Sequence, residues 1–179
     1  MLYGAMAGTI PDLDVLLNFV TDEISATAMH RGFSHSLLFC MLLGPLLGWL
    51  FFKLDRKNKA SLKQWTIMFF LVLVTHPILD AHTTWGTQFF WPIDIRLAFN
   101  NIFVIDPLYT LPFLTLVLAA MFHKRTSIKR KRLNNLALIL SSGYLLLTIV
   151  FKGICFYAFK KALNRQRIEH FSLVTKPTP

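Results

Sequence analysis

The segment THPILDAHTTWG, residues 75–86, brings together residue types that bind divalent metals. His76 and Asp80 are four residues apart, so on a helix their side chains lie on one face, one turn from each other. Neutral imidazole nitrogens and carboxylate oxygens are common ligands of zinc and related ions. His82 joins the pair if the helix ends near it. The pair alone also fits a plain hydrogen bond between histidine and aspartate, so it indicates a metal site only in combination with other residues.

Two further carboxylates stand in IPDLDVL, residues 10–16. Pro11 followed by Asp12 and Asp14 is typical of a helix start, where an acidic side chain caps free backbone N–H groups. The same two aspartates also suit a site in which carboxylates flank one or two cations. Both interpretations stay open when the motif is judged by itself.

A third polar group stands in MHRGFSHSLLF, residues 29–39. His30 and His35 are five residues apart, about 140° around a helix, so they do not share a helical face. The serine and glycine between them indicate a loop that turns into a helix, with Ser34 as the N-cap. On this geometry His35 lies in the first helical turn and His30 reaches in from the loop. Arg31 either meets an anionic group or anchors the helix at lipid headgroups.

Together the three segments supply four imidazoles and three carboxylates, enough to hold two metal ions. All three segments border apolar runs, where a carboxylate without a partner is costly. This cost favours a site in which the charges are matched. The structural alternative is a hydrogen-bond network that joins the helix ends and binds no ligand.

The elements that must position these residues are membrane helices. Of the 179 residues 54% are hydrophobic, with a mean hydropathy of +0.50 and 17 phenylalanines. A helix needs roughly 20 apolar residues to cross about 30 Å of hydrocarbon. The apolar blocks predict four such spans, although the second and third are short: Phe33–Phe52, Trp65–Leu79, Pro107–Phe122 and Leu136–Phe159.

The formal net charge of +10 follows the membrane pattern. Two basic links, residues 53–63 and 124–132, are separated by two spans and must therefore share a side, which the positive-inside rule makes cytoplasmic. Residues 1–32 and 80–106 then lie on the extracytoplasmic face, with the candidate ligands. The basic tail from Lys160 onward would lie there too, against the same rule. Nucleic-acid binding is not expected, because no aromatic or sequence motif accompanies the charge.

The predicted fold class is all-α: a polytopic membrane helical bundle with about four spans and a short or truncated N-terminal helix. We divide the chain into a membrane-embedded helical domain, residues 1–159, and the start of a truncated C-terminal extension, residues 160–179. No signal-peptide pattern opens the chain. Cys40 and Cys155 fall in apolar blocks and are expected to be small buried hydrophobes. The aromatic residues of 80–106 fit an interfacial aromatic belt better than a lipid-binding lid.

These motifs resemble a known family. In order and spacing they are similar to the YdjM-type inner-membrane, metal-dependent hydrolases: PDLD at 11–14, HRGFSHS at 30–36, HPILDAHTTWG at 76–86 with a following FFWP, and DPLY at 106–109. The resemblance implies a multi-pass protein of the bacterial cytoplasmic (inner) membrane that binds one or two divalent ions, with zinc as the expected metal. It also implies a distant relation to zinc-dependent phospholipase C and the single-strand nucleases of that fold.

Carried over by position, the resemblance assigns the metal to Asp12, Asp14, His30, His35, His76 and Asp80, with His82 as a further candidate. Family members commonly have an upstream Thr-His motif, and this chain has no histidine before Pro11. Either the helix that carries this motif is missing from this sequence, or one ligand of the family site is absent.

The first hypothesis is a hydrolase whose site faces outward and cleaves a phosphoester of a small or lipid-like substrate, with membrane lipids as partners. Asp12 or Asp14 would orient or deprotonate the attacking water, and Arg31 would hold the phosphate. The alternatives are a non-enzymatic protein that binds or passes an ion, and a metal that only joins helix ends.

Overall fold

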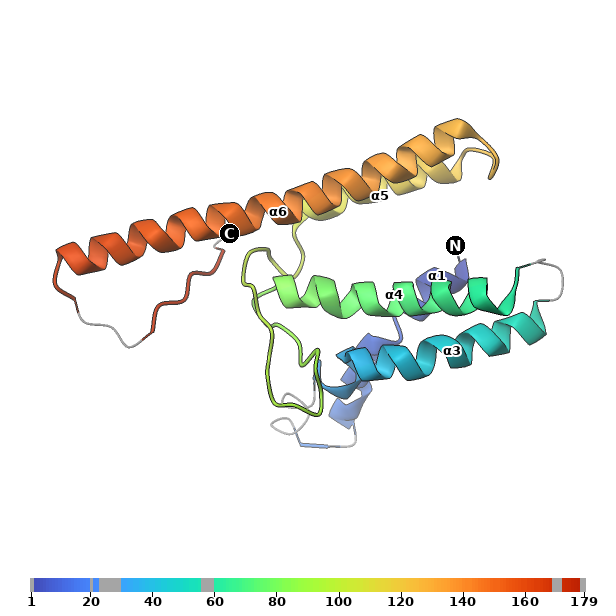
Figure 1. Ribbon diagram of the computed structural model, residues 1–179, viewed down its shortest axis with the longest axis horizontal. Coiled ribbons are helices and arrows are strands. Elements are labelled where there is room, and N and C mark those ends of the chain that lie inside the picture. Colours follow the sequence, from blue (N-terminus) through green and yellow to red (C-terminus); the bar gives the residue numbers. More distant parts are fainter. Residues whose placement is uncertain (1, 20, 23–29, 56–59, 169–171, 178–179) are drawn as a thin grey trace. The chain divides into compact units, whose positions relative to one another are not determined.

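A computed structural model describes residues 2–19, 21–22, 30–55, 60–168 and 172–177 (Figure 1). Across these ranges the regular structure is helical, apart from one isolated antiparallel bridge between Thr87 and Leu97. The all-α prediction is confirmed. In chain order the elements are α1 (Leu2–Gly8), the 3₁₀ helices η1 (Pro11–Phe19) and η2 (Phe33–His35), α3 (Leu37–Leu54), α4 (Leu62–His82), α5 (Pro107–Met121) and α6 (Ile128–Arg165).

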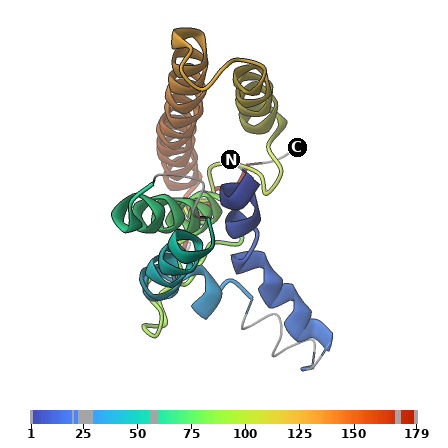
Figure 2. The ribbon, with the colours of Figure 1, turned by 90° about the vertical axis from the view of Figure 1, so that its right-hand side faces the viewer.

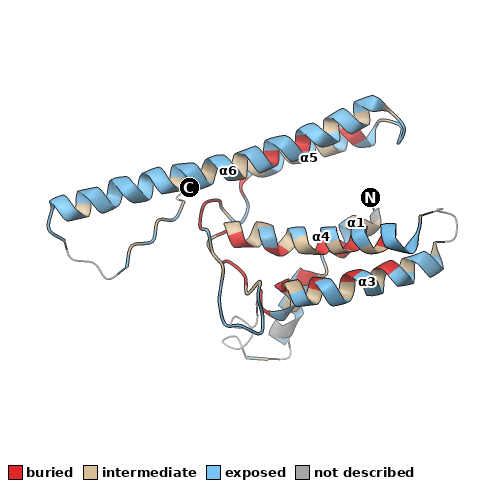
Figure 3. Cartoon of the chain, viewed as in Figure 1, coloured by how far each residue is buried: buried red, intermediate tan, exposed pale blue. Residues whose placement is uncertain are grey.

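Three helices in the described part of the chain, α3, α4 and α6, are long and apolar enough to cross a membrane. Helix α5 is apolar but has only 15 residues, a length of about 22 Å, which is less than the roughly 30 Å hydrocarbon layer. The sequence predicts four spans. Among the described residues, three helices are long enough to span, and the predicted third span corresponds to the shorter apolar helix α5. Most residues of α5 and α6 are exposed, as the mostly pale blue α6 of Figure 3 shows for that helix, and many of them are large and apolar. Such surfaces are expected where lipid surrounds the helix.

The chain divides into two compact units. The first comprises Met1–Ala81 and Trp85–Ala98, and therefore holds the Asp12, His35 and His76 motifs. The second comprises His82–Thr84 and Phe99–Pro179, with α5 and α6. In the second unit Asp106 caps α5 by accepting hydrogen bonds from two backbone N–H groups and also accepts one from Tyr144 Oη of α6, at 3.0 Å.

Aromatic rings form the core of the first unit. Phe51 of α3 contacts Trp65 and Phe69 of α4, with ring centroids 5.9 and 4.9 Å apart. Tyr3 of α1 lies against Phe51 at 4.7 Å, and Ala7 completes the buried cluster. The short helix α1 is thus held by α3 and α4, which explains how seven residues keep a helical conformation.

Helices α3 and α4 run side by side (Figures 1 and 2) because two glycines allow a close approach. A Cβ atom on Gly48 would lie 2.6 Å from Thr66 Cα, and one on Gly44 would lie 3.0 Å from Phe70 Cα. The spacing of the pair is the small-xxx-small pattern of tightly packed membrane helices.

Gly48→Ala is therefore expected to destabilise the first unit. The added methyl group would meet the backbone of Thr66, and overpacking of this kind typically costs about 1–3 kcal/mol. Gly143→Ala is the matched control, since a Cβ there has no neighbour within 4 Å. Thermal unfolding in detergent should show a lower Tm for Gly48→Ala and an equal or higher Tm for Gly143→Ala. Equal effects of the two substitutions would contradict the close packing.

The predicted start of the first span is wrong by four residues. Residues Phe33–His35 form the separate turn η2, and α3 begins at Leu37 with Ser36 as its N-cap, whose Oγ accepts from Phe39 N at 3.0 Å. Ser34, the predicted cap, instead donates its hydroxyl to Asp14 Oδ2 at 2.8 Å. His35 accordingly lies in the turn before the helix and not in the first turn of the helix.

Candidate metal centre

Four side chains of the first unit converge. One ligand atom from each of Asp12, His35, His76 and Asp80 lies within 4.8 Å of the others. His35 Nε2 is 3.2 Å from Asp80 Oδ2 and 3.5 Å from Asp12 Oδ1. His76 Nε2 is 3.2 Å from Asp12 Oδ1 and 3.6 Å from Asp80 Oδ2. A tetrahedral zinc ion with bonds of about 2.0–2.1 Å places its ligand atoms about 3.3 Å apart, close to these four separations.

Each element brings its residue to the group for a local reason. His76 and Asp80 share a face of α4 near its C-terminal end, as their spacing predicts. Asp12 comes from the first turn of η1, and His35 is the last residue of η2. The group therefore joins three segments that are far apart in the sequence, at the end of a helix able to span a membrane.

His35 has an arrangement typical of a metal ligand. Its side chain is 0% exposed, and its Nδ1 faces Asp14 Oδ2 at 3.2 Å and Ser34 Oγ at 3.0 Å. Its Nε2 points to the group of four and has no hydrogen bond of good geometry to any described residue. A buried ring nitrogen in this position calls for a ligand. The two imidazoles and two carboxylates thus fit a divalent cation.

Asp14 lies behind His35 and outside the group of four. Its carboxylate is 5% exposed and accepts from Arg31 N at 3.0 Å and Ser34 Oγ at 2.8 Å, with His30 Nδ1 at 2.9 Å. Burial opposes ionisation, but the hydrogen bonds with His35, Arg31 and Ser34 outweigh it and hold the pKa of Asp14 well below its usual range. Because an ionised carboxylate only accepts, His35 carries its proton on Nδ1 and leaves Nε2 free to bind a metal.

The charges in the first unit also suit one divalent ion. Asp12, Asp14 and Asp80 carry three formal negative charges, and Arg31 Nε lies 3.5 Å from Asp80 Oδ2. With neutral imidazoles the net charge of these groups is −2, which one divalent cation balances. In a low-dielectric environment such balance is strongly favoured.

Protonation of His35 is expected to make the stability of the metal-free protein depend on pH. Burial lowers the pKa of His35, but its close contacts with the carboxylates of Asp14 and Asp80 have a larger, opposite effect and raise it to about 9. Because the folded pKa exceeds the unfolded value of 6.5, protonated His35 stabilises the fold below about pH 6.5, and this contribution is lost as the pH rises through about 9. The Tm of metal-free protein should therefore fall over this range, and fall less in His35→Gln. If the Tm of the wild type and of His35→Gln, measured by circular dichroism, falls equally with pH, His35 is not the group responsible.

The loop after α4 makes hydrogen bonds to the backbone of Arg31 and His35. Thr87, which is fully buried, donates its Oγ1 to His35 O at 3.2 Å, and Gln88 N donates to Arg31 O at 3.0 Å. Arg31 has a φ of 59°, an uncommon value for a residue with a side chain. These bonds keep Arg31 in that conformation beside Asp80. No sequence signal marks Thr87, since threonine in a loop is common and its partners are backbone atoms distant in the chain.

The remaining candidates have other surroundings. His30 pairs with Asp14, and Arg31 lies beside Asp80, so both line the centre without belonging to the group of four. His82 belongs to the second unit, where its Nδ1 lies 3.1 Å from Asn101 Oδ1 and its ring lies against Phe99. The ligand roles of Asp14, His30 and His82 stay predictions.

A family model described as YdjM inner membrane protein matches residues 1–155. That range contains every residue of the group of four and of the motifs at 11–14, 30–36, 76–86 and 106–109. Comparisons with curated proteins and with solved structures give no significant match. The family match covers most of the 179 residues and agrees with helices able to cross a membrane. This chain belongs to the YdjM inner membrane protein family.

Proposed function

We propose that this inner membrane protein is a metal-dependent hydrolase that cleaves a phosphoester bond, with its site at the extracytoplasmic membrane face. The observation that carries the proposal is the convergence of Asp12, His35, His76 and Asp80, with His35 Nε2 directed into the group. A divalent ion bound by such ligands lowers the pKa of water and polarises a phosphoryl oxygen.

The residues around the group have separate tasks in this proposal. Asp14 fixes the orientation and tautomer of His35 and His30 through the contacts at 3.2 and 2.9 Å. His30 is 36% exposed and, with Nδ1 directed at Asp14, is suited to carry a proton between solvent and the leaving group through Nε2. Arg31 presents a guanidinium beside Asp80, which suits binding of a phosphate oxygen.

Access to the site favours a reaction over a purely structural metal. The Asp12 side chain is 56% exposed, so one side of the group of four faces solvent. A structural zinc site is usually closed by its four ligands, whereas a catalytic site keeps a position open. The neighbouring loop exposes Trp85, Phe90, Ile93 and Ile95, an apolar surface that suits a lipid-like substrate.

The test is metal analysis of the purified full chain together with a panel of phosphodiester and phospholipid substrates. We expect one divalent ion per chain, metal-dependent cleavage of at least one substrate class, and loss of both in His76→Ala. His123→Ala is the matched control, because His123 lies in the second unit, where its ring contacts Ala119 O, and is not in the group of four. Wild type that binds no metal would end the proposal. Bound metal without cleavage of any phosphoester would favour the ion-binding alternative.

A further inference from the structure

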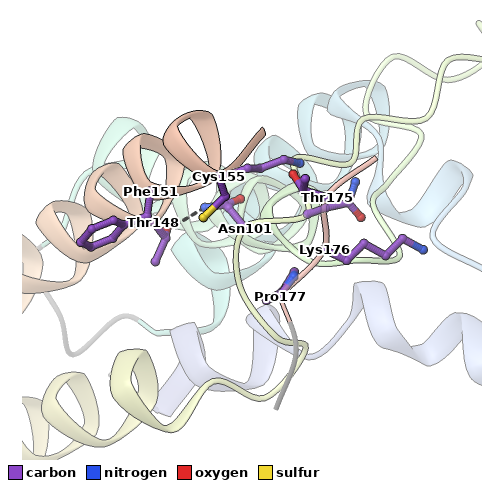
Figure 4. A pocket seen from close by; sticks show the side chains of 9 residues that line it. Asn101, Thr148, Phe151, Cys155, Thr175, Lys176 and Pro177 are labelled. Carbon is purple, nitrogen blue, oxygen red and sulfur yellow. Dashed lines mark hydrogen bonds between the residues drawn. The ribbon is translucent and has the colours of Figure 1, made fainter. Parts of the chain in front are cut away.

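The second unit contains a cavity that the metal centre does not use. It lies between α6 and the segments around Asn101 and Lys176, and has a volume of about 190 Å³ (Figure 4). Cavities for whole drug-sized ligands typically hold about 300–1,000 Å³, so this one suits a single small group. Its walls are mostly apolar, with Phe151 and Pro177 among the lining side chains. Cys155 also lines the cavity and is exposed, so the prediction that this cysteine is buried is wrong.

Lys152 gives the cavity a cationic wall. It lies in an apolar stretch of α6, and no described carboxylate lies within ion-pair distance of its ammonium group. Its Nζ donates a hydrogen bond to Phe99 O, a neutral acceptor. An ammonium group has three N–H donors, so two remain for another partner. Lysine within an apolar helix is costly unless its charge is matched, and such residues mark binding sites.

Hydrogen bonds organise other residues of the cavity lining, and none of the lining residues is an acid. Asn101 Nδ2 donates to Thr148 Oγ1 at 2.9 Å (Figure 4), and Asn101 Oδ1 lies 3.1 Å from His82 Nδ1. Thr175 Oγ1 is buried without a hydrogen-bond partner among the described residues. Lys176 adds a second ammonium group to the lining. The lining therefore offers two cations and a free hydroxyl, with no aspartate or glutamate.

We propose that this cavity is an anion site that binds a phosphate group, with Lys152 as its principal contact. Two ammonium groups match the charge of a phosphate, Thr175 Oγ1 supplies a donor, and the apolar walls accept the carbon atoms attached to the phosphate. The group can come from a lipid headgroup or from a soluble phosphate. This site is separate from the proposed hydrolase centre, and its lining shares no residue with it.

The test uses the full chain and two phosphate sources. Inorganic phosphate is titrated into protein in a neutral detergent by calorimetry, and lipid is tested by native mass spectrometry after reconstitution with phosphatidylglycerol or phosphatidylcholine. We expect Lys152→Met to weaken binding about tenfold or more, the usual effect of losing a charged hydrogen bond. Lys129→Met, which removes the same charge from the start of α6 outside the cavity, should change binding less than twofold.

The outcomes separate the sources. Inorganic phosphate binding that depends on Lys152 indicates a soluble ligand, and phosphatidylglycerol binding alone that depends on Lys152 indicates a headgroup. Thr148→Val, a substitution of similar size, provides a second variant if Lys152→Met does not fold, and should also weaken binding by disturbing Asn101. Equal binding by the Lys152 and Lys129 variants, or no binding by wild type, would overturn the proposal. Loss of the metal centre in His76→Ala should leave this binding unchanged.

Discussion

Asp80→Asn is expected to release the metal and to lower any hydrolytic rate by about 10³-fold. The substitution keeps the size of the side chain but removes the charge from an oxygen that lies 3.2 Å from His35 Nε2 and 3.6 Å from His76 Nε2. A bound metal contributes several kcal/mol to stabilisation of the transition state, which converts to a factor of this order. Metal content by mass spectrometry and initial rates on the best substrate are the measurements.

Asp94→Asn is the matched control for Asp80→Asn. Asp94 lies in the same unit, accepts a hydrogen bond from Gln88 Nε2 at 3.0 Å and is not in the group of four. We expect its metal content and rate to equal those of wild type. An Asp80→Asn protein that retains one tightly bound ion per chain would show that Asp80 is not a ligand.

Asp14→Asn should weaken metal affinity by about 10–100-fold without abolishing binding, the typical effect of losing a carboxylate that orients a metal-bound histidine. The neutral amide oxygen of the variant is a weaker acceptor for His35 Nδ1, which lies 3.2 Å from Asp14 Oδ2 in the wild type. At saturating metal the variant should still bind one ion per chain, whereas Asp80→Asn should not. Competition with a chelator measures the affinity.

The two variants distinguish positioning from ligation. If Asp14→Asn fails to bind metal at any concentration while its Tm in metal-free buffer equals that of wild type, Asp14 would have to be a ligand. The observed arrangement, with Asp14 accepting from Arg31 N and Ser34 Oγ, would then have to change on metal binding. A shift only in affinity supports the positioning role.

Local helix geometry made part of the centre predictable. Any α-helix over residues 76–80 brings His76 and Asp80 to one face, whatever the rest of the fold does. Hydropathy alone ended the second span at Leu79, yet α4 continues to His82. Helical hydrogen bonds do not stop where the apolar residues stop, and this extra turn is what places Asp80 in the centre.

The separation of Asp12 from Asp14 could not be predicted. The two residues are indistinguishable as acids in PDLD, and both were candidates for ligation. In a 3₁₀ helix with three residues per turn, the side chains of residues two positions apart point about 120° away from each other. Residues Pro11–Phe19 form such a helix, so Asp12 reaches the group of four while Asp14 lies behind His35.

The prediction that Ser34 is the N-cap of the first span was wrong for a similar reason. Ser34 and Ser36 are equally good N-caps by residue type. Ser34 is engaged by Asp14, a contact across 20 residues of sequence, and the capping role falls to Ser36. No prediction from the sequence included the Gly44 and Gly48 pair, because the partner helix against which it packs follows only from the fold.

The central claim is that Asp12, His35, His76 and Asp80 together bind one divalent ion. Anomalous diffraction from crystals of the full chain grown with zinc tests it most directly. We expect one strong peak about 2.0–2.2 Å from one atom of each of the four side chains. A strong peak between His30 and Asp14 with none among the four residues, or no peak in the first unit, would contradict the claim.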